Sequence, residues 1–388
     1  MQIRTITTGA READIERAAQ AAQLARQRLE AAGYVVQSLR LALSTSGSNR
    51  CADFATVAQG SEQQALDAGF DCVSIGQVDI ERLGQLADGI AATQALFASA
   101  RIAGPDGIAD HAAIRAAAQA ICAISVATEH GFGNMRFAAS ACVAPGSPFF
   151  PAAYHYGDRP WIAIGPEAAA LAVNATELRI ENEEQRIDSS RKPFSILTAL
   201  IEHHDAQIVS AMNGLEAETN VSFAGCDWSL APHPEPARSI GAAIEALSGV
   251  PFGAWGTLAA VRELTGAIRA ARVTQLGFSG VMLPVLEDPI LAQRNAEGRY
   301  TLRDLLAFSA VCGTGLDTIP LPGDTAAEQI VGVLEELTAL AGALRKPLTA
   351  RLLPIPGLQA GDLIQFAAVG DSPLAGGLCD SRVMRIES

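Results

Sequence analysis

The residues best suited to chemistry gather in short polar stretches, and the most distinctive of these spans residues 311–325. It holds one thiol, Cys312, and two carboxyls, Asp317 and Asp324, among three glycines and two prolines. Glycine takes backbone conformations that other residues disfavour, and proline removes a donor from a sheet. The pattern therefore predicts a strand end and a turn that displays polar groups. Cys312 is a candidate for a catalytic thiol or an ordinary core cysteine, and Asp324 for a pocket residue or a helix N-cap.

A phenol and an imidazole follow a stiff apolar segment. Phe149, Phe150 and Pro151 precede Tyr154 and His155 by only a few residues. An imidazole exchanges protons near neutral pH, and a phenol donates a hydrogen bond. We expect His155 to be a general acid or base and Tyr154 to contact a ligand. The alternative is that the imidazole is structural.

Two further carboxyls stand at the ends of predicted strands. Asp227 follows a strand expected at residues 220–224, and Glu287 ends an almost wholly apolar strand expected at 280–286. In parallel α/β proteins, functional groups gather where strands end. We expect Asp227 to bind a ligand and Glu287 to serve as a general acid or base. Asp227 could instead cap the strand end, and Asp288, which precedes Pro289, is expected to begin a helix.

Two arginines are candidates for binding an anion. Arg50 ends a polar loop at residues 44–50, and Arg136 lies just before a strand expected at 137–143. A guanidinium holds a carboxylate or phosphate through paired N–H groups, although the loop around Arg50 could be a plain connection. Asp227, Asp317 and Asp324 could also hold a divalent cation through oxygen ligands, so the cofactor is left unknown. The sequence contains no P-loop, no Rossmann glycine motif and no nucleophile elbow, which are the common nucleotide and hydrolase signatures.

The elements that must position these residues alternate along almost the whole chain. This alternation predicts an α/β protein with a largely parallel sheet and helical crossovers. No linker divides the chain, so residues 1–388 are expected to form a single domain, and eight or more βα units favour a closed barrel over an open sheet. Helices are expected, among other places, at residues 10–32, 111–128, 193–216 and 326–344.

Composition narrows the classes of function. The 388 residues are 49% hydrophobic and 18% charged, with a formal net charge of −14. A protein that binds the phosphate backbone of nucleic acids needs a basic face, so nucleic acid is not an expected partner. No apolar run is long enough for a spanning helix, and the first residues lack the layout of a signal peptide. We therefore expect no membrane partner and a cytoplasmic location. The seven scattered cysteines predict neither a disulfide framework nor a zinc site.

Several of these stretches, taken in chain order, resemble the uncharacterised DUF711 family. The resemblance is carried by residues 3–7, 134–139, 149–155, 227–232 and 311–325, and the last of these is the most specific. It implies a fold like that of pyruvate formate-lyase and related glycyl-radical enzymes, a ten-stranded α/β barrel with a loop inside. Such enzymes carry a glycine near the C-terminus after an Arg-Val pair. This chain has Arg382 and Val383 but lacks that glycine. We therefore expect no glycyl radical.

Together these features predict an enzyme that acts on a small polar or carboxylate-bearing molecule in a barrel pocket by acid/base chemistry. The alternative is a non-catalytic protein that senses a metabolite and signals to a partner. The sequence does not name the reaction, so whether the chain is an enzyme stays open. Its abundant alanines make a homo-oligomer a further expectation.

Overall fold

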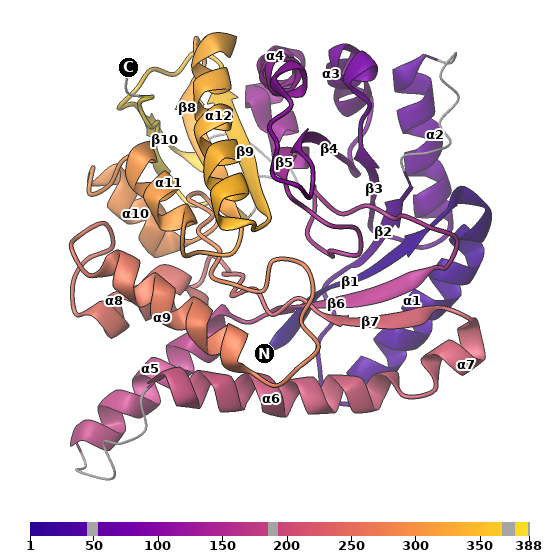
Figure 1. Ribbon diagram of the computed structural model, residues 1–388, viewed down its shortest axis with the longest axis vertical. Coiled ribbons are helices and arrows are strands. Elements are labelled where there is room, and N and C mark those ends of the chain that lie inside the picture. The colour runs from indigo at the N-terminus through magenta and orange to yellow at the C-terminus, as the bar shows by residue number, and fades with distance from the viewer. Residues whose placement is uncertain (45–52, 185–192, 367–376, 387–388) are drawn as a thin grey trace.

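The computed structural model describes residues 1–44, 53–184, 193–366 and 377–386. It is a mixed α/β structure built around a large sheet (Figure 1). The strands are β1 (Gln2–Ala10), β2 (Leu39–Leu43), β3 (Cys72–Gln77), β4 (Leu96–Ala103), β5 (Phe137–Ala141), β6 (Trp161–Glu167), β7 (Ser222–Cys226), β8 (Gly315–Pro322), β9 (Leu348–Ile355), β10 (Leu363–Ile364) and β11 (Ser381–Arg382). The α-helices are α1 (Ile15–Ala31), α2 (Phe54–Asp67), α3 (Leu86–Ala91), α4 (His111–Ala127), α5 (Ala169–Glu184), α6 (Pro193–Met212), α7 (Leu215–Thr219), α8 (Ile240–Ser248), α9 (Thr257–Ala270), α10 (Pro289–Ala296), α11 (Leu302–Ser309) and α12 (Ala327–Leu344).

The main sheet has nine strands in the order β7-β6-β1-β2-β3-β4-β5-β9-β8, and β10 pairs with β11 separately. Strands β1 to β5 run parallel to one another. The pairs β6–β7 and β8–β9 are also parallel, and they join the first block through antiparallel contacts of β1 with β6 and β5 with β9. The predicted alternation and the largely parallel sheet are confirmed.

A closed ten-stranded barrel is not confirmed. The two outermost strands, β7 and β8, do not pair with each other, and no continuous hydrogen-bond ladder closes the sheet within the described residues. Residues 275–285 lie between β7 and β8, and their β pairing with the flanking segments is limited to isolated bridges, such as Pro284 to Asp317. The expected strand at 280–286 does not form as a regular strand. Pro284 lacks an N–H, and Gly277 and Ser279 have positive φ angles of 64° and 37°, which interrupt an extended segment.

Small side chains bring the helices close to the sheet. Ala18, Ala21, Ala22 and Ala25 of α1 recur at helical spacing and are fully buried. In β2, Leu39, Leu41 and Leu43 face this helical layer, while the residues between them face the other way. The expected helix at 10–32 is shorter than predicted, because Ala10 still belongs to β1 and a 3₁₀ turn (Glu12–Asp14) precedes α1.

The inner face of the sheet wraps around the loop at residues 144–160. Phe150 and Ala153 of this loop form a cluster with Ala42 of β2 and with Trp161 and Ala163 of β6. The loop is tied down by hydrogen bonds from Thr7 to the Pro148 carbonyl (3.3 Å) and from Ser74 to the Ala153 carbonyl (2.7 Å). It therefore forms an insert that packs against the sheet, with residues 150–153 buried.

Two prolines in β8 are tolerated because β8 is an edge strand. β8 pairs with β9 on one side only, so Pro320 and Pro322 need no N–H on the other side. The register slips between Leu316 and Ile319, where Thr318 adopts a positive φ of 48°. This bulge turns Asp317 toward the neighbouring segment, whose Val285 N–H donates to the Asp317 carbonyl (3.1 Å).

Candidate functional site

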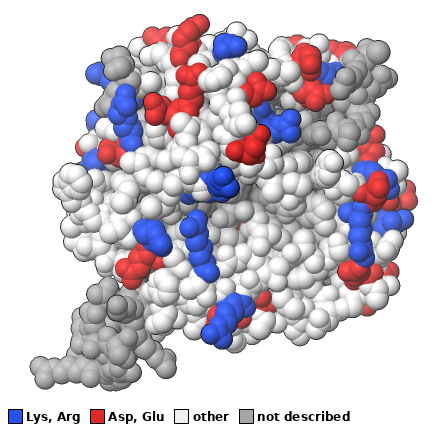
Figure 2. Space-filling view, viewed as in Figure 1, with Lys and Arg blue, Asp and Glu red and all other residues white. Residues whose placement is uncertain are grey.

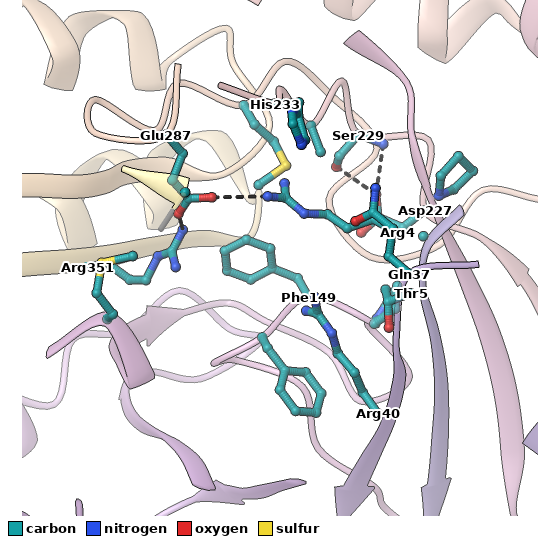
Figure 3. A pocket seen from close by; sticks show the side chains of 18 of the residues that line it. Arg4, Thr5, Gln37, Arg40, Phe149, Asp227, Ser229, His233, Glu287 and Arg351 are labelled. Carbon is teal, nitrogen blue, oxygen red and sulfur yellow. Dashed lines mark hydrogen bonds and ion pairs between the residues drawn. The ribbon is translucent and has the colours of Figure 1, made fainter. Parts of the chain in front are cut away.

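A cavity of about 510 Å³ opens on the inner side of the sheet (Figure 3). The cavity lies beside the ends of β6, β7 and the segment at 281–286, and beside the beginnings of β1 and β2. Strand ends and strand beginnings meet there because β6 and β7 run antiparallel to β1 and β2. Its walls are Arg4, Thr5, Gln37, Arg40, Phe97, Met135, Pro148, Phe149, Phe150, Gly165, Pro166, Asp227, Ser229, Ala231, His233, Pro234, Met282, Glu287, Arg351, Gly377 and Leu378.

Alternating charges line one wall of this pocket (Figure 3). Arg4 Nη2 donates to Glu287 Oε2 (3.2 Å), and Arg351 Nη2 donates to Glu287 Oε1 (2.8 Å). Arg351 Nε also donates to Asp317 Oδ1 (2.5 Å). Asp317 is fully buried, and its Oδ2 is without a hydrogen-bond partner in the described part of the chain. Asp317 thus fixes Arg351 from the interior, and Arg351 fixes Glu287 at the pocket surface.

The backbone places these three residues in contact. Glu287 follows a turn in which its own N–H donates to the Pro284 carbonyl (3.2 Å), and Leu286 N–H donates to the Thr318 hydroxyl (3.2 Å). These contacts hold the end of the segment against the bulge of β8. Arg351 projects from β9, the neighbour of β8, so its guanidinium reaches both carboxylates.

Burial and the nearby positive charges shift the pKa values of Glu287 and Asp317 in opposite directions. Burial alone would raise the pKa of Glu287, but the positive charges of Arg351 and Arg4 outweigh it and lower that pKa. For Asp317, burial prevails over the nearby Arg351 and raises the pKa. Arg351 itself has a raised pKa because both carboxylates stabilise its charge despite burial. Glu287 is therefore ionised at neutral pH and Arg351 is charged.

Arg40 is the cation of the pocket without a carboxylate partner in the described residues. Its Nε donates to the Ser38 hydroxyl (3.1 Å), and its guanidinium lies over the Phe150 ring, 5.4 Å from the centroid. No described residue accepts a hydrogen bond from its Nη1 or Nη2. Burial lowers the pKa of Arg40, and the charges of Arg4 and Arg351 lower it further, although Cys72 and Glu287 oppose them. A bound anion would relieve this repulsion.

Asp227 shapes the pocket wall. Its carboxylate accepts hydrogen bonds from the Ser229 N–H (3.1 Å) and hydroxyl (2.6 Å), and from the N–H groups of Phe278 (3.0 Å) and Ser279 (2.9 Å). A side chain at Gly277 would collide with Asp227, since its Cβ would lie 2.1 Å from Oδ2. Burial raises the pKa of Asp227, although these donors oppose it. The carboxylate lines the pocket, but its hydrogen bonds organise two loops.

His155 and Tyr154 do not line the pocket. His155 is buried, its Nε2 lies 2.9 Å from the Gly157 carbonyl, and its ring is next to Trp161. Burial lowers the pKa of His155, and Nδ1 has no partner in the described ranges. The Tyr154 hydroxyl donates to the Val143 carbonyl (3.1 Å). Both residues instead hold the loop at 144–160 against the sheet.

The other predicted site residues are also apart from the pocket. Arg136 is buried and donates to the Thr93 hydroxyl and to the carbonyls of Ile90 and Leu96, so it caps the end of α3. Burial lowers its pKa to about 10. Cys312 is fully buried after α11, where Gly315 N–H points at its sulfur (3.4 Å).

Asp324 and Arg50 are the remaining predicted site residues. Asp324 accepts a hydrogen bond from Gln359 (3.3 Å). The prediction that Asp324 caps the next helix is wrong, because α12 begins at Ala327 and its N-cap is Ala326. Arg50 lies outside the described residues. Asp288 does cap α10, as predicted.

Sequence reasoning missed the three arginines that define the pocket, Arg4, Arg40 and Arg351. A signal was present, since each is the only charged residue of its strand. A charged side chain in a buried strand requires a partner or a ligand. That test would have selected all three.

Two features are absent from the described residues. No group of three or more His, Cys, Asp or Glu side chains is placed to hold a metal ion within those ranges. Within the same ranges, no helix has both the length and the apolar character needed to cross a membrane. On the face seen in Figure 2, the described Lys and Arg side chains are interspersed with Asp and Glu.

Comparison with known proteins gives the family but no activity. The model of the family described as "Uncharacterised ACR (DUF711)" matches residues 1–371. A UPF0210 protein of Pyrobaculum arsenaticum is 32% identical over 241 residues, 60% of this chain and 52% of that protein. The corresponding protein of Clostridium perfringens is 25% identical over 362 residues, covering 88% and 78%, and that of Methanosarcina acetivorans is 27% identical over 346 residues, covering 84% and 73%. The match to the Pyrobaculum arsenaticum relative spans about half of that protein's length. The predicted resemblance is therefore confirmed, and the chain belongs to the DUF711 family.

Proposed function

We propose that this protein is an enzyme that binds a small carboxylate-bearing molecule in the pocket and moves a proton on it, with Glu287 as the general base. The observation that carries the proposal is the imbalance of charge around the cavity. Arg4 and Arg351 share the carboxylates of Glu287 and Asp317, whereas Arg40 has no such partner in the described chain. A carboxylate bound to the Nη1 and Nη2 groups of Arg40 would complete the pairing.

The partial burial of Arg40 strengthens this argument. A charged group withdrawn from water is costly unless it is paired, and the lowered pKa of Arg40 reflects that cost. Arg4 and Arg351 are close enough for their charges to act on Arg40, so an anion between them would be attracted by all three. This favours an anionic ligand over a neutral or cationic one.

Glu287 is the carboxylate best placed for proton transfer. It lines the cavity, and its lowered pKa keeps it ionised at neutral pH, so it can accept a proton from a substrate atom. Its protonated form would then be a stronger acid than an ordinary carboxyl and would return the proton readily. The proposed chemistry needs no glycyl radical. It also does not need His155 or Cys312, neither of which lines the cavity.

One feature of Glu287 favours a second function, that of a non-catalytic metabolite sensor. Both Glu287 oxygens already accept hydrogen bonds from arginines, and a carboxylate with a lowered pKa is a weak base. A pocket that binds a metabolite without changing it, and signals to a partner, would have the same structure. The two functions differ in whether the ligand is consumed.

We also propose that residues 275–285 occupy the place of a tenth strand in a barrel resembling that of pyruvate formate-lyase. The isolated bridges on both sides of this segment support the proposal. A crystal structure in which residues 275–285 run away from β7 or β8 would contradict it.

Calorimetry and NMR on one panel of small carboxylates test the proposed function. Arg40→Gln should weaken binding roughly 10- to 100-fold, because it removes charge-assisted hydrogen bonds. Arg101→Gln, on β4 and outside this cavity, is the matched control and should bind like the wild type. Glu287→Gln should bind but not consume the ligand. Binding without consumption by the wild type would support the sensor, and equal affinity of Arg40→Gln and wild type would refute both functions.

A further inference from the structure

We infer that the ligand of this pocket is a carboxylate that carries a flat apolar group, such as an aromatic ring, bound against Phe149. This inference deepens the proposed function and depends on it. Its starting point is the apolar wall of the cavity. That wall is formed by Phe97, Met135, Phe149, Phe150, Met282 and Leu378.

The aromatic part of this wall is held in place before any ligand binds. The Phe149 ring meets Phe278 edge to face at 5.0 Å, and the Phe150 ring meets Phe97 in the same way at 5.2 Å. The loop that carries both rings is anchored through Pro148 and Ala153, as described above. A preformed apolar surface favours a ligand that has its own apolar surface to bury.

Cations lie directly beside these rings. The guanidinium of Arg351 is 5.8 Å from the centroid of Phe149, and that of Arg40 is 5.4 Å from the centroid of Phe150. A ligand whose carboxylate binds Arg40 therefore has its neighbouring atoms next to a phenylalanine. Since Arg351 contacts both Phe149 and Glu287, the same apolar group would lie next to the proposed base.

The size of the cavity favours a ligand larger than an acid of two or three carbons. At about 510 Å³ it falls in the range of pockets that accommodate drug-sized ligands. An acid of two or three carbons would leave water in contact with Phe149 and its apolar neighbours. A ring displaces that water and buries apolar surface on both partners.

Matched pairs of acids test the inference by titration calorimetry on the full chain. Acetate is compared with phenylacetate, and propionate with 3-phenylpropionate. Burying roughly 80 to 100 Å² of ring surface at about 25 cal/mol/Å² should make each phenyl acid bind roughly 30- to 60-fold more tightly than its partner. Removing the ring of Phe149 in Phe149→Ala should reduce this ratio to below about tenfold. The matched control is Phe194→Ala, which alters a partly buried ring outside the cavity.

Each outcome separates this inference from the proposed function. Equal affinity for phenyl and alkyl acids in the wild type would overturn the inference, while binding that still depends on Arg40 would leave the proposed function standing. If 3-phenylpropionamide binds as tightly as 3-phenylpropionate, the carboxylate anchor fails, and the proposed function fails with it. Because the acid pairs are compared in the wild type, the test does not require that Phe149→Ala folds.

Discussion

Replacing Arg351 by methionine tests whether this residue holds two buried carboxylates together. Arg351 is only 8% exposed and contacts Glu287 at 2.8 Å and Asp317 at 2.5 Å. Removing one partner of a buried ion pair costs about 3–5 kcal/mol, and here two carboxylates lose the same cation. We therefore expect a loss in this range in the free energy of unfolding. With a urea slope of about 3 kcal/mol/M, the unfolding midpoint would fall by about 1 to 1.7 M.

The loss should depend on pH in a defined direction. Without Arg351, burial and mutual repulsion would raise the folded-state pKa of Glu287 above the value of about 4 in an unfolded chain, and they would raise the pKa of Asp317 further. A carboxyl with a raised folded pKa binds its proton more tightly in the folded state. The penalty is therefore full above the folded pKa and disappears as pH falls to about 4. Urea unfolding of both proteins between pH 4 and pH 7 measures this difference.

Two further variants make the test specific. Arg294→Met removes an arginine that contacts Glu245 at 2.7 Å in a more exposed setting, with 17% and 20% exposure, and should cost about 1 kcal/mol or less. Adding Asp317→Asn to Arg351→Met removes one unpaired carboxylate and should restore part of the stability. The reasoning is refuted if Arg351→Met costs no more than Arg294→Met and its deficit is the same at both pH values.

The other predictions concern single residues. Asp288 accepts hydrogen bonds from the first N–H groups of both α8 and α10. Asp288→Ala should therefore lower the free energy of unfolding by about 2–4 kcal/mol in urea. A loss no larger than that of Asp53→Ala, which removes an exposed helix cap, would contradict this. Arg136→Met should destabilise the protein by about 2–3 kcal/mol without changing ligand affinity, because it leaves buried carbonyls unpaired; the opposite pattern would make Arg136 a ligand residue. The lowered pKa of Glu287 contributes stability above about pH 4 that is lost as pH falls through its folded pKa, so Glu287→Gln should show a flatter acid limb in unfolding experiments than the wild type.

The periodic and local features of the chain were readable from the sequence. The alternation of apolar strands and Ala-rich helices predicted the largely parallel sheet, and the Asp288-Pro289 pair predicted the start of α10. These features depend on residues close together in the chain. The family match was likewise carried by short local stretches.

Candidate site residues were harder to select. Asp227 and Glu287 do line the cavity, because each follows a segment whose end borders it. His155 and Arg136 have equally suggestive neighbours in sequence, yet their hydrogen bonds go to nearby carbonyls and leave them apart from the cavity. Residue type and local context do not tell whether a polar group faces a pocket or completes the packing.

By itself, the sequence determined the alternation of strands and helices and the largely parallel sheet, although the strand expected at 280–286 does not form as a regular strand. Only the tertiary structure decided how residues 311–325 are connected to the cavity. The connection is made by Asp317, which binds the cavity residue Arg351, and not by Cys312 or Asp324. It also decided that the arginines lining the cavity are Arg4, Arg40 and Arg351, which lie far apart in the chain on β1, β2 and β9. The physical reason is that charge pairing in a low-dielectric interior depends on distances of a few ångströms in space, and these are set by the antiparallel joining of two parallel blocks of strands.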